Sequence, residues 1–192
     1  MFVKQINMNK FQELLNAFSI LAPSITLLYI NNNYSLDTIA FITTTILHNM
    51  SSFTYHMLCY YDYIKDKINN NYRKLDQSMI HVSSIIYSYV ISQNYYYGLL
   101  MLLLNTNYIY RLWFFNDNGL NRRLNICKSM ILYLSPIIYN KHYIYFFRAI
   151  FYIILFILSF HFNYLFYGYG HFISHLFLAP YVYVLYNYII KN

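Results

Sequence analysis

Charged residues are too scarce along this chain to cover a water-soluble fold. Only 10% of the residues are Asp, Glu, Lys or Arg, whereas 59% are hydrophobic. A typical globular domain has about a quarter charged residues, so we expect an integral membrane protein. A spanning helix needs about 20 residues, and seven spans would take up roughly 140. The 192-residue chain then has no room for an appended soluble domain.

Seven apolar runs along the chain are long enough to be spanning helices. Asn-rich or charged connectors separate them, and no internal repeat or linker divides the chain. The expected helices are residues 14–30, 38–61, 76–93, 95–114, 124–140, 143–166 and 168–190. The sequence therefore predicts an all-α fold, a polytopic seven-transmembrane-helix bundle in which residues 1–192 form a single domain.

Basic residues divide unequally between the two sides of this arrangement. With a cytoplasmic amino terminus, the inner side holds Lys4, Lys10, Lys65, Lys67, Arg73, Lys74, Arg111, Arg122, Arg123 and Lys128. The outer side holds only Lys141, Arg148 and Lys191. Cytoplasmic loops of membrane proteins carry such an excess of Lys and Arg. We therefore expect the amino terminus inside and the carboxy terminus outside, and this orientation accounts for the net charge of +7 without a nucleic-acid partner.

Two residue types exclude further classes of function. The four glycines, at positions 98, 119, 168 and 170, do not form the cluster before a helix that a P-loop or GxGxxG turn needs. We therefore expect no nucleotide cofactor. The two cysteines, Cys59 and Cys127, lie at the ends of apolar runs, so we expect no disulfide framework.

Four ionisable side chains within the expected spans are candidates for a site: His56, Asp76, His171 and His175. Such groups are costly inside a bilayer and mark functional sites there. His171 and His175 are an i,i+4 pair, which places both rings on one helical face, about 6 Å apart at Cβ and able to share a metal ion. Alternatively, two transmembrane histidines simply hydrogen-bond neighbouring carbonyls.

Ser52 and Asp76 have structural alternatives of the same kind. Ser52 lies one turn before His56, and its hydroxyl can bond the carbonyl four residues earlier. Asp76 opens the third expected span, where Asp is a good N-cap. The common depth of these groups argues for a site. His56 lies about 7 Å inside its span, and the pair on the last span lies about 5 to 10 Å inside. All four ionisable groups fall on one side of the membrane.

Three neutral imidazoles at one depth predict a catalytic zinc site, in which three protein ligands leave the fourth position to water. Zinc lowers the pKa of such a water toward about 7 and polarises the carbonyl under attack. Asp76 would orient the water and pass its proton to the leaving group. Ser52 would donate a hydrogen bond to the developing oxyanion. Apolar surroundings imply a substrate that arrives through the lipid.

Three short motifs in these spans resemble those of a known superfamily. They are Ser-Phe-Thr-Tyr-His at 52–56, Leu-Asp-Gln-Ser-Met-Ile at 75–80 and His-x3-His at 171–175. Together they are similar to the CREST-type seven-helix superfamily of alkaline ceramidases, progestin and adipoQ receptors, hemolysin III proteins and myomaker-like proteins. The resemblance implies a zinc ion (Zn2+) held by His56, His171 and His175, with Asp76 and Ser52 beside the water.

For the substrate, the resemblance implies a membrane lipid such as ceramide or a phospholipid, cleaved at an amide or ester bond. Two features depart from the superfamily. The acidic amino-terminal calcium site of alkaline ceramidases has no counterpart, since Glu13 is the only Glu in the chain. The Gly-Thr-Tyr-x-Pro of hemolysin III proteins is replaced by Ile-Ile-Tyr-Ser-Tyr at 85–89.

The sequence thus leaves three hypotheses of different classes. The leading one is an intramembrane zinc-dependent lipid hydrolase. The second is a membrane receptor, scaffold or remodelling protein with a structural zinc site, and the third is a multispan protein with ordinary packed histidines. Transport has little support, because no second set of ionisable groups continues across the membrane. His48 lies two turns from His56 and is either a partner of the site residues or, as we expect, a packing residue. We also expect packing roles for His142 and His161, and His81 is rotated away from the face of Asp76.

Overall fold

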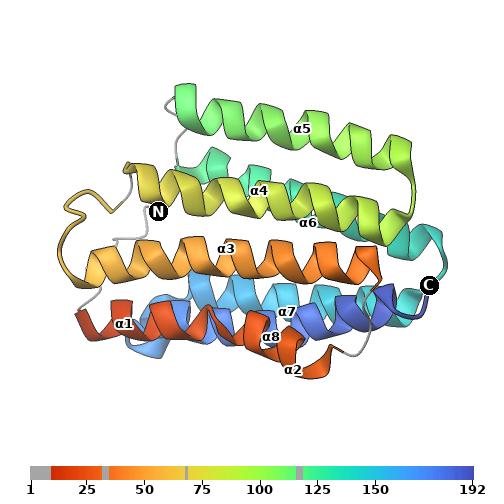
Figure 1. Cartoon of the computed structure of the whole chain (residues 1–192). Helices are drawn as coiled ribbons and strands as arrows, with labels where there is room; N and C mark the ends of the chain where they lie inside the picture. Colours follow the sequence, from red (N-terminus) through yellow and green to blue (C-terminus); the bar gives the residue numbers. More distant parts are fainter. Residues whose placement is uncertain (1–9, 32–34, 68, 116–118) are drawn as a thin grey trace.

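The computed structural model describes residues 10–31, 35–67, 69–115 and 119–192 (Figure 1). Within these residues the chain is helical and has no strand. The elements are α1 Lys10–Ser19, α2 Ala22–Ile30, α3 Leu36–Tyr60, α4 Asn71–Ser92, α5 Tyr95–Phe114, α6 Gly119–Tyr139, α7 Tyr143–His161, the short 3-10 helix η1 Asn163–Phe166, and α8 Gly170–Ile189. The prediction of an all-α fold is confirmed.

The long helices lie side by side in one bundle, with their axes roughly aligned (Figure 1). The α4 helix packs against α3, α5 and α6, and α8 packs against α7, α2 and α1. The α1 helix contacts both α3 and α8. Residues near the start of the chain therefore lie beside residues from its middle and its end.

Side chains of Ser35, Asn70 and Asn94 cap the first turns of α3, α4 and α5. Each accepts a hydrogen bond from the backbone N–H three residues later. Such caps satisfy N–H groups that have no partner within the helix. Because Asn70 is the cap, α4 begins at Asn71 rather than at residue 76. Asp76 therefore lies inside the helix, and the alternative that it serves as an N-cap is wrong.

The first expected helix, residues 14–30, is broken into α1 and α2 at residues 20–21. Pro23 in the first turn of α2 explains the break. Proline has no N–H to donate, and its ring clashes with the carbonyl four residues earlier, which belongs to Ser19, the last residue of α1. The carbonyls in the last turn of α1 are thereby available to side-chain donors.

Three segments are long and apolar enough to cross a membrane: Lys10–Ile30, Tyr143–His161 and Gly170–Ile189. They support membrane association. By this criterion the described helices α3 to α6 do not qualify, so the seven-span bundle stays a prediction. Polar side chains that face the interior lower the hydropathy of α3 and α4. The buried ones are Thr38, Thr44, Thr45, Asn49, Ser52 and His56 in α3 and Asp76, Ser78, His81, Ser83, Ser84 and Ser88 in α4.

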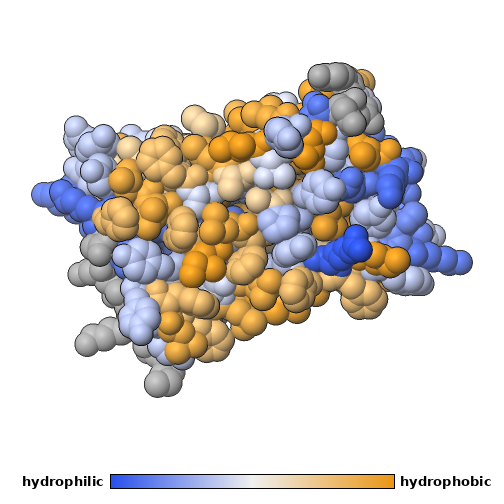
Figure 2. Space-filling view, turned by 90° about the horizontal axis from the view of Figure 1, so that it is seen from below, coloured by the Kyte–Doolittle hydropathy of each residue, from blue (hydrophilic) through white to orange (hydrophobic). Residues whose placement is uncertain are grey.

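Large apolar side chains cover much of the outer surface. On α5 the exposed ones include Leu99, Leu100, Leu102 and Leu103. Figure 2 shows one face of the molecule, on which apolar residues spread across the middle and the most hydrophilic residues lie toward the two ends. An outer surface this rich in large apolar side chains, together with the polar side chains buried in α3 and α4, is the reverse of what a water-soluble bundle needs.

Candidate metal centre

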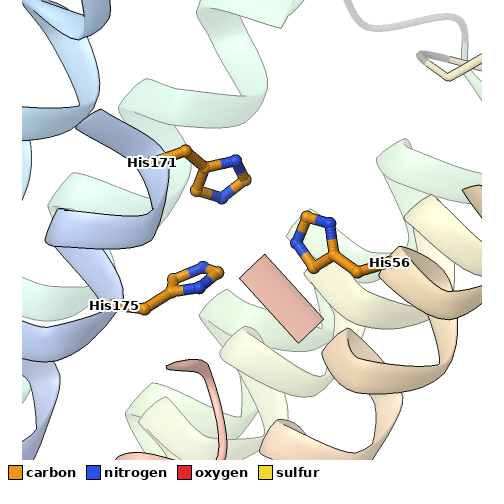
Figure 3. A group of neighbouring side chains, drawn as sticks. All are labelled: His56, His171 and His175. Carbon is orange, nitrogen blue, oxygen red and sulfur yellow. The ribbon is translucent and has the colours of Figure 1, made fainter. Parts of the chain in front are cut away.

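Three histidines from α3 and α8 lie together inside the bundle (Figure 3). His56, His171 and His175 are all buried, and one ring nitrogen of each lies within 4.8 Å of the corresponding atoms of the other two. The ring centroids of the two α8 histidines are 4.6 Å apart, and that of His56 is 5.0 and 5.6 Å from them. This cluster can hold a metal ion, as the sequence predicts.

The spacing of the three nitrogens fits a tetrahedral metal site after a small adjustment. Zinc binds imidazole nitrogens at about 2.0–2.1 Å, which places two tetrahedral ligands about 3.4 Å apart. Starting from a separation of at most 4.8 Å, the nitrogens have to approach one another by no more than about 1.4 Å. Rotation of the histidine side chains can provide this movement without any shift of the helices.

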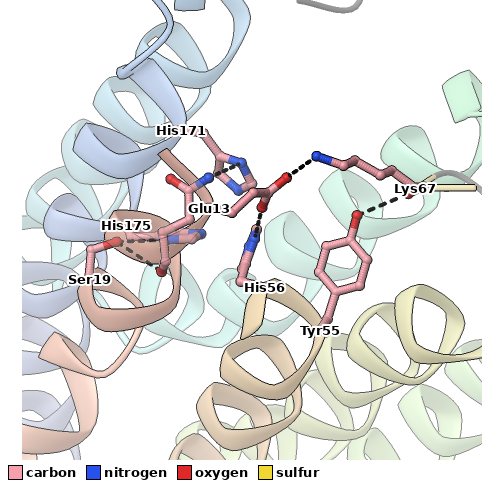
Figure 4. Close-up of polar contacts among 8 residues, drawn as sticks. Glu13, Ser19, Tyr55, His56, Lys67, His171 and His175 are labelled. Atoms are coloured by element: carbon pink, nitrogen blue, oxygen red, sulfur yellow. Dashed lines mark hydrogen bonds and ion pairs between the residues drawn. The ribbon is translucent and has the colours of Figure 1, made fainter. Parts of the chain in front are cut away.

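One face of α1 contacts the rings of all three histidines. Three polar residues spaced three apart along α1, and therefore on one helical face, each contact the Nδ1 atom of one histidine (Figure 4). The pairs are Glu13 with His56 at 2.9 Å, Asn16 with His171 at 3.4 Å and Ser19 with His175 at 3.0 Å. In metalloproteins, such partners orient the ligand ring and fix its tautomer.

Two contacts with residues of α1 determine which ring nitrogen carries the proton in His56 and in His175. An ionised carboxylate and a backbone carbonyl only accept hydrogen bonds. The Glu13 carboxylate accepts from Nδ1 of His56, and the Asn16 carbonyl lies 3.2 Å from Nδ1 of His175. Both rings are therefore protonated at Nδ1 and keep the Nε2 lone pair for a metal. The Asn16 amide can turn its oxygen toward His171, which then has the same tautomer.

Sequence reasoning missed all three α1 residues. The signal was present, because Glu13 is the only Glu in the chain and lies in an apolar segment long enough to span a membrane. An intramembrane carboxylate is itself an indication of a site. Asn16 and Ser19 then follow on the same helical face. The first expected helix begins at residue 14, so Glu13 lies one residue before it and was not counted as part of a span.

The connector between α3 and α4 contacts this part of the site through Lys67. Lys67 donates a hydrogen bond from Nζ to Oε1 of Glu13 at 2.7 Å, and Tyr55 donates from its hydroxyl to the Lys67 carbonyl at 2.9 Å. Lys10 and Asp62 form an ion pair of 2.5 Å at the start of the connector. Glu13 thus has a cationic partner on one oxygen and an imidazole on the other.

Ser52 and Asp76 are buried on the helices around the triad. Ser52 lies one turn before His56 on α3. The carboxylate Oδ1 of Asp76 lies 4.0 Å from Nε2 of His48, which is beyond the length of a direct hydrogen bond. His48, for which packing was expected, is therefore beside a predicted catalytic residue. The three histidines are brought together, and the catalytic roles of Ser52 and Asp76 stay predictions.

His81 belongs to a different buried network. Its Nδ1 lies 2.8 Å from the side-chain oxygen of Asn105 in α5, and the Ser129 hydroxyl of α6 donates to the same oxygen at 2.7 Å. The network joins α4, α5 and α6. His161 is exposed at the end of α7. Among the described residues, only the cluster of three histidines has the spacing of a metal site.

Comparison of the chain with protein-family models, with curated proteins and with solved structures finds no match. The assignment of function therefore rests on the arrangement of the chain's own residues. Imidazole nitrogens suit zinc, copper, iron or nickel rather than magnesium or calcium. The buried triad is thus a candidate site for a transition metal.

Proposed function

We propose that this protein is an intramembrane zinc-dependent hydrolase that cleaves an amide or ester bond of a lipid. The observation that carries the proposal is the buried triad of His56, His171 and His175, with each Nδ1 atom engaged by α1. Three protein ligands with one open position are the arrangement of catalytic zinc sites. The similarity of residues 52–56, 75–80 and 171–175 to the superfamily of alkaline ceramidases and adipoQ receptors supports a lipid substrate.

The proposal includes seven crossings of the membrane, with α1 and α2 counted as one rod. The α3 to α6 helices are 25, 22, 20 and 21 residues long. A helix of 20 residues is about 30 Å long, which matches the hydrocarbon thickness of a bilayer. The apolar outer surface and the polar interior of these helices support the same arrangement. An amino terminus in the cytoplasm follows from the unequal distribution of Lys and Arg.

In the proposed reaction a water oxygen bonds to the carbonyl carbon, and the bond from that carbon to the leaving nitrogen or oxygen breaks. Zinc in this site would supply Lewis acidity to the carbonyl and a water molecule that is acidic near neutral pH. Asp76 takes the proton of the attacking water and returns it to the leaving atom. Ser52 donates a hydrogen bond to the carbonyl oxygen as negative charge develops on it. Glu13 holds the His56 ring in position.

A receptor, scaffold or remodelling protein with a structural zinc is the second candidate. Two observations favour it. All three histidines are buried, and the carboxylate of Asp76 lies 4.0 Å from His48 rather than against a member of the triad. A general base has to lie beside the metal-bound water, so this placement of Asp76 favours a metal that only ties the helices together. The two candidates differ in what Asp76 does, and substitution of this residue separates them.

The metal content of the purified protein tests the shared part of both candidates. In detergent, elemental analysis of the wild-type protein should give about one zinc per chain. A variant with His171→Ala and His175→Ala should contain none. His161→Ala is the matched control, because this histidine is exposed at the end of α7 and should not affect the metal. Wild-type protein without zinc, or a double variant that retains it, contradicts the site.

Hydrolysis is tested with labelled lipid amides and esters, including ceramides and phospholipids, scored for released fatty acid. For a hydrolase, Asp76→Asn should retain zinc and lose turnover, because the amide cannot accept the proton of the water. For a structural site, the same variant should retain both zinc and biological activity. Wild-type protein that holds zinc and releases no fatty acid from any of these lipids favours the structural candidate.

A further inference from the structure

A second feature of the interior is a cavity of about 70 Å³ that lies deeper in the bundle than the histidines. Residues of α2, α3, α4, α6 and α8 line it. Its lining residues closest in sequence to the proposed site are Asn49, Ile80 and Leu178, which lie one or two helical turns from His56, Asp76 and His175. At 1.5 Å per residue, the cavity begins about 5 to 11 Å along the helices from the residues of the proposed site.

Most polar groups in the cavity wall already bond to one another. The Thr45 and Tyr87 hydroxyls are 2.6 Å apart, and the Tyr133 and Tyr181 hydroxyls are also hydrogen-bonded. Asn49 donates from its amide nitrogen to a serine hydroxyl of α2 at 2.7 Å. The remaining wall holds the imidazole of His48 and the apolar side chains of Pro23, Ile80, Met130, Leu178 and Val182. A ligand in the cavity would therefore meet mainly hydrocarbon and already satisfied polar groups.

Ser83 differs from the other hydroxyl-bearing residues of this wall. Its side chain lines the cavity and is only 4% exposed, yet its hydroxyl has no hydrogen-bond partner within the described part of the chain. Ser84 and Ser88 on the same helix donate to backbone carbonyls one turn earlier, at 2.9 and 2.7 Å. A buried hydroxyl without a partner is destabilising. The geometry of Ser83 is therefore suited to a partner that enters the cavity.

We infer that this cavity binds a hydroxyl-bearing aliphatic segment of the substrate lipid and that Ser83 hydrogen-bonds its hydroxyl. The inference rests on the proposed lipid hydrolase. Binding pockets commonly combine apolar walls with a few polar groups that provide specificity. An apolar cavity of roughly 150 Å³ accepts a benzene ring. A cavity of about 70 Å³ accordingly fits a few carbon atoms and one hydroxyl. Its distance from the histidines places that hydroxyl several carbon atoms from the scissile carbonyl.

Two lipids that differ in one hydroxyl test the inference. The substrates are a palmitoyl amide and its analogue with a hydroxyl several carbon atoms from the carbonyl. With the wild-type protein, the hydroxylated amide should have a KM about tenfold lower, the effect of one well-formed hydrogen bond. Equal KM values for the two amides overturn the inference and leave the proposed hydrolase intact.

Ser83→Ala assigns the effect to one side chain. This variant should abolish the difference between the two amides, while its unfolding temperature should not fall, because the lost hydroxyl has no partner in the protein. Ser88→Ala is the matched control, since Ser88 is a buried serine of α4 outside the cavity, and it should preserve the difference. If Ser83→Ala still prefers the hydroxylated amide, another residue is responsible for the preference, and the inference is overturned.

A binding measurement keeps the test independent of turnover. Thermal unfolding of the wild-type protein and of Ser83→Ala is followed in detergent with each amide added. The hydroxylated amide should raise the unfolding temperature of the wild type more than the plain amide does, and Ser83→Ala should respond equally to both. If the wild type hydrolyses neither amide but shows this difference in binding, the proposed hydrolase activity is contradicted, and the inferred binding of the hydroxyl in the cavity is supported. Equal shifts in the wild type show that the cavity does not select the hydroxyl.

Discussion

The contact between His56 and Glu13 has consequences for metal affinity. A carboxylate that accepts from Nδ1 holds the imidazole in one tautomer and makes Nε2 a better electron donor. Here the carboxylate is held in turn by Lys67, through a 2.7 Å hydrogen bond to its other oxygen. The orientation of His56 therefore depends on a residue from the first helix and a residue from a connector, neither of which binds the metal.

Replacing Glu13 by Gln tests this dependence. The amide has nearly the shape of the carboxylate but no negative charge, and Lys67 loses its ionic partner. Loss of such a partner typically lowers metal affinity about 10- to 100-fold. The measurement is a competition titration of zinc against a chelating dye in detergent. Asp62→Asn is the matched control, because this carboxylate forms only an exposed ion pair with Lys10 and should leave the affinity unchanged. Equal losses in the two variants would refute a specific role for Glu13.

At the scale of the helix, local patterns predicted the ligands but not what holds them. The spacing of His171 and His175 is a property of one helix, so the sequence could place both rings on one face. The approach of α1 to α3 and α8 is a tertiary contact, which no local pattern contains. The start of α4 was also missed, because Asp76 was considered as the cap while Asn70 is the residue that caps the helix.

The break between α1 and α2 gives a prediction for the whole of α1. Pro23 ends α1 after Ser19, and the last turn of α1 places the Asn16 carbonyl 3.2 Å from Nδ1 of His175. In Pro23→Ala, residue 23 regains an N–H for the Ser19 carbonyl, and α1 and α2 can join into one helix. The joined helix would draw the face of α1 away from the histidines. We therefore expect weaker zinc binding with unchanged or increased helicity, measured by titration and circular dichroism.

The control for this variant is Pro136→Ala. Pro136 lies inside α6, away from α1, and the helix runs through it without a break. This substitution should leave the zinc affinity unchanged. If Pro23→Ala binds zinc as tightly as the wild type does, the broken helix is unnecessary for the metal centre, and the contacts of α1 form in either geometry.

At the scale of the whole molecule, the composition predicts a membrane protein, whereas α3 to α6 do not qualify as membrane spans by hydropathy. The distribution of polar residues explains this difference for α3 and α4. Hydropathy averages a helix over all its faces, whereas α3 and α4 place serine, threonine and histidine inside. The predicted orientation is tested by tags at each end in sealed cells. A protease or antibody added outside should reach the carboxy-terminal tag only. Access to the amino-terminal tag would contradict seven crossings with a cytoplasmic amino terminus.

The candidate metal centre also joins distant parts of the chain, because His56 lies on α3, and His171 and His175 lie on α8. A ligand that binds only the folded protein stabilises it by about 4.1 kcal/mol at a thousandfold excess over its dissociation constant. Removing zinc with a chelator should therefore lower the unfolding temperature in detergent, and adding zinc, but not magnesium, should restore it. The variant with His171→Ala and His175→Ala should show no response to either treatment, since it lacks the site. A chelator that strips zinc from the wild type without changing its unfolding temperature would mean that the metal does not hold α3 and α8 together.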